Sequence, residues 1–380
     1  MAGTLRRILS SRALCAAAIA VFLLLTAAEG TWGIALHRNP AMWAVAVVMM
    51  VSLGSAIPDD IRKRRGPAGT LSHTGMFLLL FGTLCGAPCM VDVQMVAPSG
   101  SEVREAFSRN GEVEELPFGV RLEAFDVEYY ADGVSPKQYT STLLVDGRRM
   151  RTSVNHPCRY KGYRIYQSDY DRKEGAYSVL KLVRDPWLPV VFLGLLLLAA
   201  AAVLSLKRYW NSWYALAATA AVALAFGAIS LARINFGTLM PALRSLWFIP
   251  HIALYMLAYA SLALALIAGG VAAFSGRWPG LAPLSEKLSG TASSLLLLGM
   301  ICGAVWAKAA WGDWWTWDSK ECWAAVTWLM TVLGTHLPQR LRKGRGAALA
   351  CTLLAFIAMQ VAWYGVDLLP AAQWSLHTYR

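Results

Sequence analysis

The chain has 380 residues, of which 57% are hydrophobic and only 15% are charged, and its mean hydropathy is +0.44. This composition excludes an ordinary soluble globular protein, in which about 25% of residues carry a charge. The net charge of +12 would suit a nucleic-acid partner. The basic residues, however, gather beside apolar runs rather than on one basic surface. We therefore expect a membrane protein and no nucleic-acid partner.

Nine apolar runs are candidates for transmembrane helices, because a span needs about 20 apolar residues and only helices satisfy their own backbone in lipid. They lie at 13–28, 41–57, 72–90, 187–206, 213–231, 250–271, 291–307, 322–336 and 347–366. Basic clusters flank alternate runs, as expected of cytoplasmic loops. These clusters are Arg6, Arg7 and Arg12; Arg62, Lys63, Arg64 and Arg65; Lys207 and Arg208; and Arg340, Arg342, Lys343 and Arg345. The sequence thus predicts a polytopic α-helical membrane protein with about nine transmembrane helices, starting in the cytoplasm.

The first run has two interpretations. It could be a secretory signal peptide, with TAAEG as a cleavage region. We favour a helix that is retained, and the topology of the remaining chain is the same in either case.

The chain divides into three parts: 1–90, with three helices; 91–186, soluble in composition; and 187–380, with six helices. In the middle part apolar and polar residues alternate between turn signals, which is typical of antiparallel strands. The alternating segments are FGVRLEAFDVEYY, YTSTLLVDGRRMRTSV, YKGYRIYQSDY and AYSVLKLVR. Because this part follows an outward-running helix, we expect one small β-rich extracytoplasmic domain, a β-sandwich or a meander.

Cys85 and Cys89, in CGAPC, are the two cysteines that approach the outer end of a helix. They could form a disulfide in an oxidising compartment. Their spacing is not that of a CxxC redox pair.

Four of the six histidines lie at predicted helix ends, where an ionisable group is costly and suggests function. His73 and His336 are predicted at cytoplasmic ends, and His251 and His377 at outer ends. Two neutral imidazoles can hold one haem iron from opposite faces. His37 and His156 lie in polar loops and are assigned no role.

The stretch WGDWWTWDSKE holds Trp311, Trp314, Trp315 and Trp317 within seven residues. An interfacial aromatic belt explains many tryptophans in membrane proteins. The density here, followed at once by charges, favours a flat apolar ligand such as a porphyrin, whose propionates Lys320 and other cations at the rim could bind. Asp318 and Glu321 lie three residues apart and could hold Lys320 or the indole N–H groups in place. Asp313 is expected to be a surface polar residue.

WGDWWTWDSKECW resembles the tryptophan-rich WWD motif of cytochrome c maturation proteins. With PHIALYMLAY, VTWLMTVLGTHLPQR and the terminal SLHTYR, the segment 187–380 resembles CcsA (ResC) of the System II cytochrome c synthase. LSHTGMFLLLFGTLCG and the β-rich domain resemble its partner, CcsB (ResB). The chain is therefore similar to a compact CcsB–CcsA fusion. The family's terminal motif usually reads LHSYG, whereas this chain reads LHTYR.

This resemblance implies the residue roles. An inner site would bind haem b between His73 and His336, and an outer site between His251 and His377. Attachment to an apocytochrome CxxCH segment would occur at the motif. The residues expected to carry attachment are Trp311, Trp314, Trp315, Trp317 and Asp318, with Gly312, Lys320 and Glu321 in contact with the haem. The resemblance also implies thiol-reducing partner proteins and a place in a bacterial cytoplasmic membrane.

Two other functions stay open on the sequence. A haem exporter or chaperone would need the same ligands but would make no thioether product. A thiol- or quinone-linked membrane oxidoreductase would use Cys85 and Cys89 and bind no haem.

Overall fold

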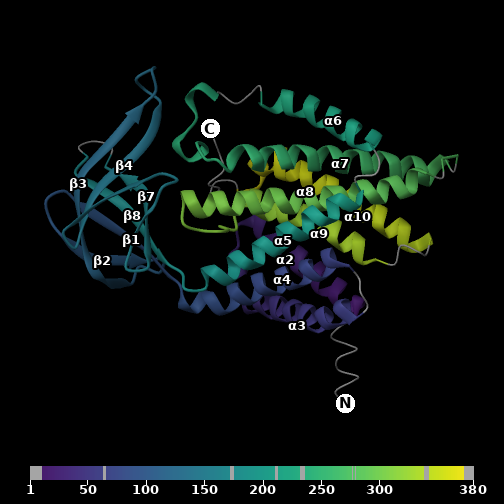
Figure 1. Ribbon diagram of the computed structural model, residues 1–380, viewed down its shortest axis with the longest axis horizontal. Helices are drawn as coiled ribbons and strands as arrows, with labels where there is room; N and C mark the ends of the chain where they lie inside the picture. The colour runs from purple at the N-terminus through teal and green to yellow at the C-terminus, as the bar shows by residue number, and fades with distance from the viewer. Residues whose placement is uncertain are drawn as a thin grey trace, which may run out of the picture.

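The computed structural model describes residues 11–62, 66–171, 175–209, 213–231, 236–275, 277–278, 280–337 and 342–371. A bundle of helices carries a β domain beyond one end (Figure 1). Within the described ranges each of the nine apolar runs coincides with a helix. The helices are α2 (Arg12–Trp32), α3 (Pro40–Arg62), α4 (Pro67–Gly86), α5 (Leu188–Tyr209), α6 (Trp213–Leu231), α7 (Phe248–Ser275), α8 (Leu281–Ala310), α9 (Ser319–His336) and α10 (Arg342–Gln360).

Among the residues that the structure describes, seven of these helices are long and apolar enough to cross a membrane. The other two predicted spans are α6 and α9. In α6 the side chains of the continuous stretch Leu216–Ala225 are described, and this stretch is apolar, so α6 as a full span stays a prediction. α9 is an 18-residue helix with polar residues in its first turn. A multi-pass membrane protein is therefore confirmed, with seven helices rather than nine meeting both criteria among the described residues.

The domain between α4 and α5 is one antiparallel sheet of eight strands in the order β5-β4-β3-β2-β1-β8-β7-β6. The strands are β1 (Val91–Pro98), β2 (Val103–Ser108), β3 (Val113–Tyr129), β4 (Pro136–Val145), β5 (Arg148–Ser153), β6 (Cys158–Tyr160), β7 (Tyr163–Tyr170) and β8 (Tyr177–Arg184). The four predicted segments became β3 to β8, whereas β1 and β2 were not predicted. A two-sheet sandwich is wrong, because every strand belongs to this one sheet.

The sheet is rolled so that its two edge strands meet. Ser153 N donates to His156 O (3.2 Å) in the turn between β5 and β6, and Thr152 Oγ1 on β5 donates to Ile165 O on β7 (2.7 Å). The enclosed core includes fully buried Met95, Phe118 and Leu143. Rolling the sheet covers edges that would otherwise expose unpaired backbone groups.

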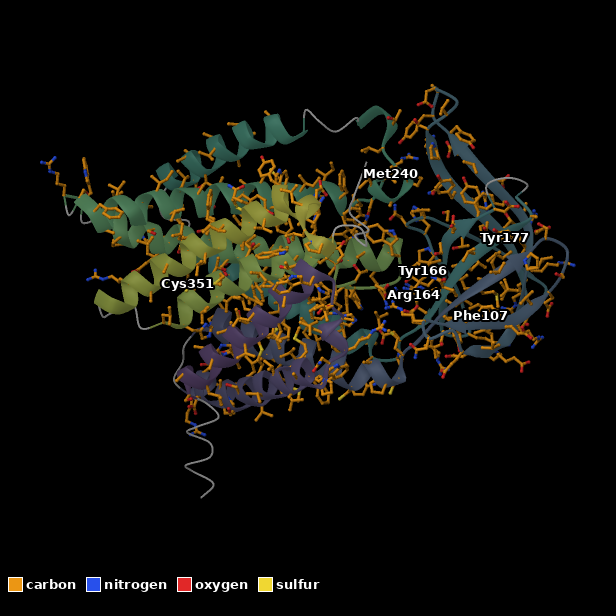
Figure 2. All side chains as sticks on the ribbon, turned by 180° about the vertical axis from the view of Figure 1, so that it is seen from behind. Phe107, Arg164, Tyr166, Tyr177, Met240 and Cys351 are labelled. Carbon is orange, nitrogen blue, oxygen red and sulfur yellow. The ribbon has the colours of Figure 1, made fainter. Side chains whose placement is uncertain are left out.

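Contacts at the border fasten the β domain to the helices. Tyr130 donates to Leu239 O (2.9 Å) and Asn155 Nδ2 to Pro241 O (2.9 Å), both in the segment that leads into α7. Tyr166 and Arg164 lie at this border, whereas Cys351 lies far from it among the helices (Figure 2). The β domain thus sits over the end of the bundle at which α7 and α9 begin.

Cys85 and Cys89 are free thiols, the first half-buried and the second exposed. The disulfide that the sequence allowed is therefore not formed in the structure.

Glycines bring α4 and α5 into close contact. A Cβ atom built on Gly75 would lie 2.9 Å from the carbonyl oxygen of Gly194, and a Cβ on Gly194 would lie 2.9 Å from the carbonyl oxygen of Gly75. Small residues at such crossings allow membrane helices to pack through their backbones.

We expect Gly75→Ala to lower the thermal unfolding midpoint of the detergent-purified protein, because the added methyl group meets backbone and overpacking costs about 1–3 kcal/mol. Gly69→Ala on the same helix is the matched control, since no described residue beyond its own stretch of helix lies within 4 Å of its Cβ position. Equal unfolding midpoints for the two variants would contradict this packing.

Candidate functional site

The tryptophan motif forms the loop between α8 and α9. Two residues in it have positive φ: Gly312 (84°) and Trp317 (61°). Glycine accepts this backbone conformation freely, whereas a bulky residue there is strained and persists only when its surroundings hold it. Asp318 then caps α9, its side chain accepting from Glu321 N (2.9 Å).

Glu321 and Cys322 hold the same loop from the first turn of α9. Glu321 Oε2 accepts from Thr316 N (2.6 Å) and from Thr316 Oγ1 (3.0 Å). Cys322 Sγ donates to the carbonyl of Trp317 (3.3 Å). In a capping box, an acidic residue three positions after the cap accepts a hydrogen bond from the backbone N–H of the cap residue. Here Glu321 is in that position but binds the backbone N–H of Thr316, two residues before the cap Asp318. These bonds give Asp318 and Glu321 a role in the shape of the loop.

The contacts between indoles among the described residues are tilted or edge to face rather than stacked. Trp311 contacts Trp306 of α8, with centroids 5.4 Å apart, and Trp306 contacts His251 at 5.9 Å. Trp315 meets Trp317 edge to face at 6.3 Å. Trp314 Nε1 is buried without a hydrogen-bond partner among the described residues. A buried donor of this kind is costly unless a ligand or water satisfies it.

His251, in the first turn of α7, is firmly placed. Its Nδ1 donates to the carbonyl of Gly299 (2.8 Å), and its ring lies edge-on to Tyr255 at 4.9 Å. A Cβ on Gly303 would lie 2.7 Å from this ring, so α8 needs glycine there. An imidazole whose Nδ1 binds a carbonyl coordinates metal through Nε2, so this arrangement fits an iron ligand. The second predicted outer ligand, His377, lies outside the described residues.

The two predicted inner histidines lie at helix ends remote from the β domain: His73 near the start of α4 and His336 at the end of α9. His73 Nδ1 is hydrogen-bonded to the carboxylate of Asp60, which is only 1% exposed. His336 Nδ1 donates to Val332 O (2.9 Å). Metal-binding imidazoles are commonly oriented by such a carboxylate or carbonyl partner. Both side chains therefore have the support expected of a ligand.

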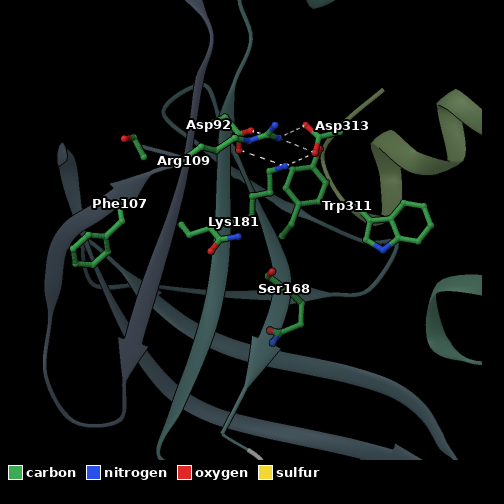
Figure 3. A pocket seen from close by; sticks show the side chains of 11 residues that line it. Asp92, Phe107, Arg109, Ser168, Lys181, Trp311 and Asp313 are labelled. Atoms are coloured by element: carbon green, nitrogen blue, oxygen red, sulfur yellow. Dashed lines mark hydrogen bonds and ion pairs between the residues drawn. The ribbon is translucent and has the colours of Figure 1, made fainter. Parts of the chain in front are cut away.

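Asp313 is not a surface polar residue as expected. Its carboxylate binds Lys181 Nζ (2.6 Å) and Arg109 Nη2 (3.1 Å), and both cations also contact Asp92. These four charges line a cavity of about 520 Å³ between the sheet and Trp311 (Figure 3). They join the motif loop directly to β1, to β8 and to the turn after β2.

Two further polar residues at the loop were not identified from the sequence as part of the site. Lys308 is 4% exposed and donates to Gly312 O (2.8 Å), with Trp314 5.7 Å from its ammonium group. His37, in the loop after α2, stacks on Trp317 and is hydrogen-bonded to buried Glu29. Acidic Glu29 near the end of an apolar run was the one available signal.

Comparison with known proteins gives two family matches. The ResB-like family matches residues 68–180, and the cytochrome c assembly protein family matches residues 187–372. Neither match includes α2 or α3.

Curated relatives share the second half. A cytochrome c biogenesis protein CcsA from Synechococcus sp. (strain RCC307) is 35% identical over 222 residues, covering 46% of this chain and 69% of the relative. CcsA proteins from Prochlorococcus marinus (strain MIT 9515) and Chlamydomonas reinhardtii are both 33% identical over 37% of this chain, which spans 55% and 42% of their lengths. The chain therefore belongs to the CcsA family of cytochrome c assembly proteins and carries a ResB-like segment ahead of its CcsA-like half, consistent with a System II fusion.

Proposed function

We propose that this protein binds haem b as a substrate, passes it from an inner to an outer site, and attaches it to the CxxCH cysteines of apocytochrome c. The observation that carries the proposal is the motif loop, which is shaped by Asp318 and Glu321. Its Trp311 contacts Trp306, which in turn contacts the carbonyl-anchored ring of His251. The curated relatives are named for cytochrome c biogenesis. The protein acts from a bacterial cytoplasmic membrane, with the β domain and the loop on the outer side.

Two pairs of imidazoles would hold the iron. His73 and His336 form the inner site, remote from the β domain, and His251 and His377 the outer one. Paired imidazoles occupy both axial positions of iron and keep oxygen away from it. Lys320 binds a haem propionate at the rim. The N–H of Trp314, which has no acceptor among the residues that the structure describes, offers a further donor to an oxygen of the ligand.

Attachment of haem to cysteine depends mainly on how the thiol and the haem vinyl group are positioned. A cysteine S–H adds across a haem vinyl group: sulfur bonds to the carbon next to the ring, and the proton ends on the terminal carbon, with no net oxidation. Holding the thiol and the vinyl group in register is worth several kcal/mol of the barrier, roughly 7–11 in the best intramolecular cases. The reactive double bond belongs to the haem, so the protein has to orient it. The residues that would do so are the indoles of Trp311, Trp314, Trp315 and Trp317.

The first test is the visible spectrum of the detergent-purified protein and of its histidine variants. We expect low-spin bis-imidazole haem in the wild type and loss of outer-site haem in His251→Ala. His73→Ala and His336→Ala should deplete both sites, because the inner site feeds the outer one. Wild-type haem content in either inner variant would contradict the relay.

Co-expression with a CxxCH reporter decides between ligation and transport. Covalent haem on the reporter supports the synthase, whereas bound haem with no thioether product would favour an exporter or chaperone. A colourless wild-type protein with redox-active Cys85 and Cys89 would instead favour the thiol oxidoreductase.

Asp60→Asn should weaken haem binding at the inner site by about 10–100-fold, because carboxylates that orient a ligating imidazole have effects of this size. Haem titration of the purified protein measures the loss. Asp59→Asn, which removes the same charge one residue earlier, is the control and should bind haem as the wild type does. Equal weakening in both variants would show an effect of charge rather than of the bond to His73.

Glu321 distinguishes loop support from proton transfer. A glutamine side chain still offers an oxygen to Thr316 N but cannot exchange a proton as a carboxylate does. We expect Glu321→Gln to retain reporter attachment within about threefold, and Glu321→Ala to lose at least tenfold through the missing bond, worth about 1–3 kcal/mol. Loss of attachment in Glu321→Gln would instead assign acid–base catalysis to this residue.

A further inference from the structure

The hairpin α2–α3 carries a carboxylate–imidazole pair that no family match covers. Glu29, in the last turn of α2, is 3% exposed. Its Oε2 accepts from His37 N (3.0 Å), and its Oε1 is hydrogen-bonded to Nδ1 of the same histidine. A buried carboxylate needs such partners, because an unpaired charge is strongly disfavoured away from water. Both the backbone and the ring of His37 are therefore held by one side chain.

A second contact fixes the loop that contains His37. Trp43 Nε1, from the first turn of α3, donates to the carbonyl of His37 (2.9 Å). Gly33 ends α2 with φ of 68° and donates to Glu29 O (2.8 Å). The His37 imidazole therefore belongs to a short turn that is fixed by hydrogen bonds at both ends.

The imidazole lies flat on a residue of the tryptophan motif. The rings of His37 and Trp317 are stacked, with centroids 5.4 Å apart and planes 7° apart. Among the described residues other than glycine, four have a positive φ, and Trp317 is the aromatic one of these. A bulky side chain in this conformation is rare and needs its environment to hold it. His37 covers one face of the indole, and Trp315 meets the same indole edge to face.

Packing of α2 on α9 fixes the position of the α2–α3 hairpin relative to the tryptophan motif. α2 packs along α9, with Ile19 and Leu23 against Val326 and Leu329. A Cβ on Gly30 would lie 2.6 Å from Cβ of Cys322, so the two helices approach closely beside Glu29. Cys322 also donates to the carbonyl of Trp317. The pair and the strained tryptophan are therefore parts of one packed unit.

We propose that Glu29 and His37 are positioning residues of the outer site: Glu29 orients the His37 ring, and His37 fixes the Trp317 indole for haem. This inference rests on the proposed function. It adds to the site a segment preceding both family matches, which begin at residues 68 and 187. The loop between α8 and α9 is then supported by two further helices. α2 supports it through His37, which stacks on Trp317, and α7 supports it through His251, whose ring contacts Trp306, the neighbour of Trp311.

The experiment measures covalent haem on a CxxCH reporter, the visible spectrum and the thermal unfolding midpoint of the full-length protein. We expect His37→Ala to reduce attachment at least tenfold and to alter the spectrum of the outer haem, while haem at the inner site is retained. His37→Phe keeps a flat ring against Trp317 and should recover part of the activity. Glu29→Gln, which removes the charge that orients the ring, should give an intermediate loss.

His156→Ala is the matched control, since His156 is an exposed histidine in the β domain, and it should behave as the wild type. If His37→Ala matches this control in attachment and spectrum, the inference is wrong. If both attachment and unfolding midpoint collapse in His37→Ala and His37→Phe alike, the role is structural and the inference is also wrong.

A double-mutant cycle tests whether His37 acts through Trp317. Residues that act as one unit have non-additive effects. In a Trp317→Ala background, His37→Ala should therefore change attachment by less than about twofold. Independent, multiplied losses would overturn the inference. If the wild-type protein itself attaches no haem, the proposed function fails first, which is seen before any variant is compared.

Discussion

Buried carboxylates at helix ends fix the positions of the residues at the proposed haem sites. An ionised carboxylate in a poorly hydrated place must receive hydrogen bonds, because its desolvation is otherwise too unfavourable. Glu29, Asp60 and Asp318 are each at least nine-tenths buried and each lies at or near a helix end. Glu29 and Asp60 are each bonded to an imidazole, and Asp318 caps α9. Each acid therefore fixes the position of a residue at a proposed haem site.

Close helix packing makes these local bonds act at a distance. α4 and α5 meet through Gly75 and Gly194, and α2 meets α9 at Gly30. Backbones that approach this closely have little freedom to slide, since packed interiors resist small displacements. The buried acid on α2 can therefore specify where an indole that follows α8 will lie, although some 290 residues separate them along the chain.

The helices, the positions of His73, His251 and His336 near helix ends, and most of the strands could be predicted from the sequence because their signals are local. Apolar runs, alternation and turn residues need no knowledge of the rest of the chain. β1 was missed because its apolar residues directly continue the run of α4, and β2 because VREAFS is short and charged. Successive membrane-spanning helices run in opposite directions, so the sequence also predicts which ends of α4, α7 and α9 lie near the β domain. His377 lies outside the described residues, so its placement stays a prediction.

The parts that could not be predicted depend on partners that are distant in sequence. Asp313 looked like a surface residue because its cations, Arg109 and Lys181, belong to another domain. His37 lay in a polar loop with no sign that Trp317 would cover its ring. In both cases the residue type allowed the contact, but only the packing of the domains selected it.

The ion pairs of Asp313 give a physical reason for uniting a β domain and a tryptophan loop in one chain. An exposed ion pair contributes about 0–1 kcal/mol, and Arg109 is half-exposed. Lys181 and Asp313 are only 11% and 17% exposed, and Asp92 contacts both cations, so this group is better shielded from solvent. On separate chains such a contact would also have to overcome the entropy of association. In one chain the linkers on either side of the β domain already hold it over the end of the bundle. Even a modest electrostatic contribution is therefore sufficient to set the loop against β1, β8 and the turn after β2.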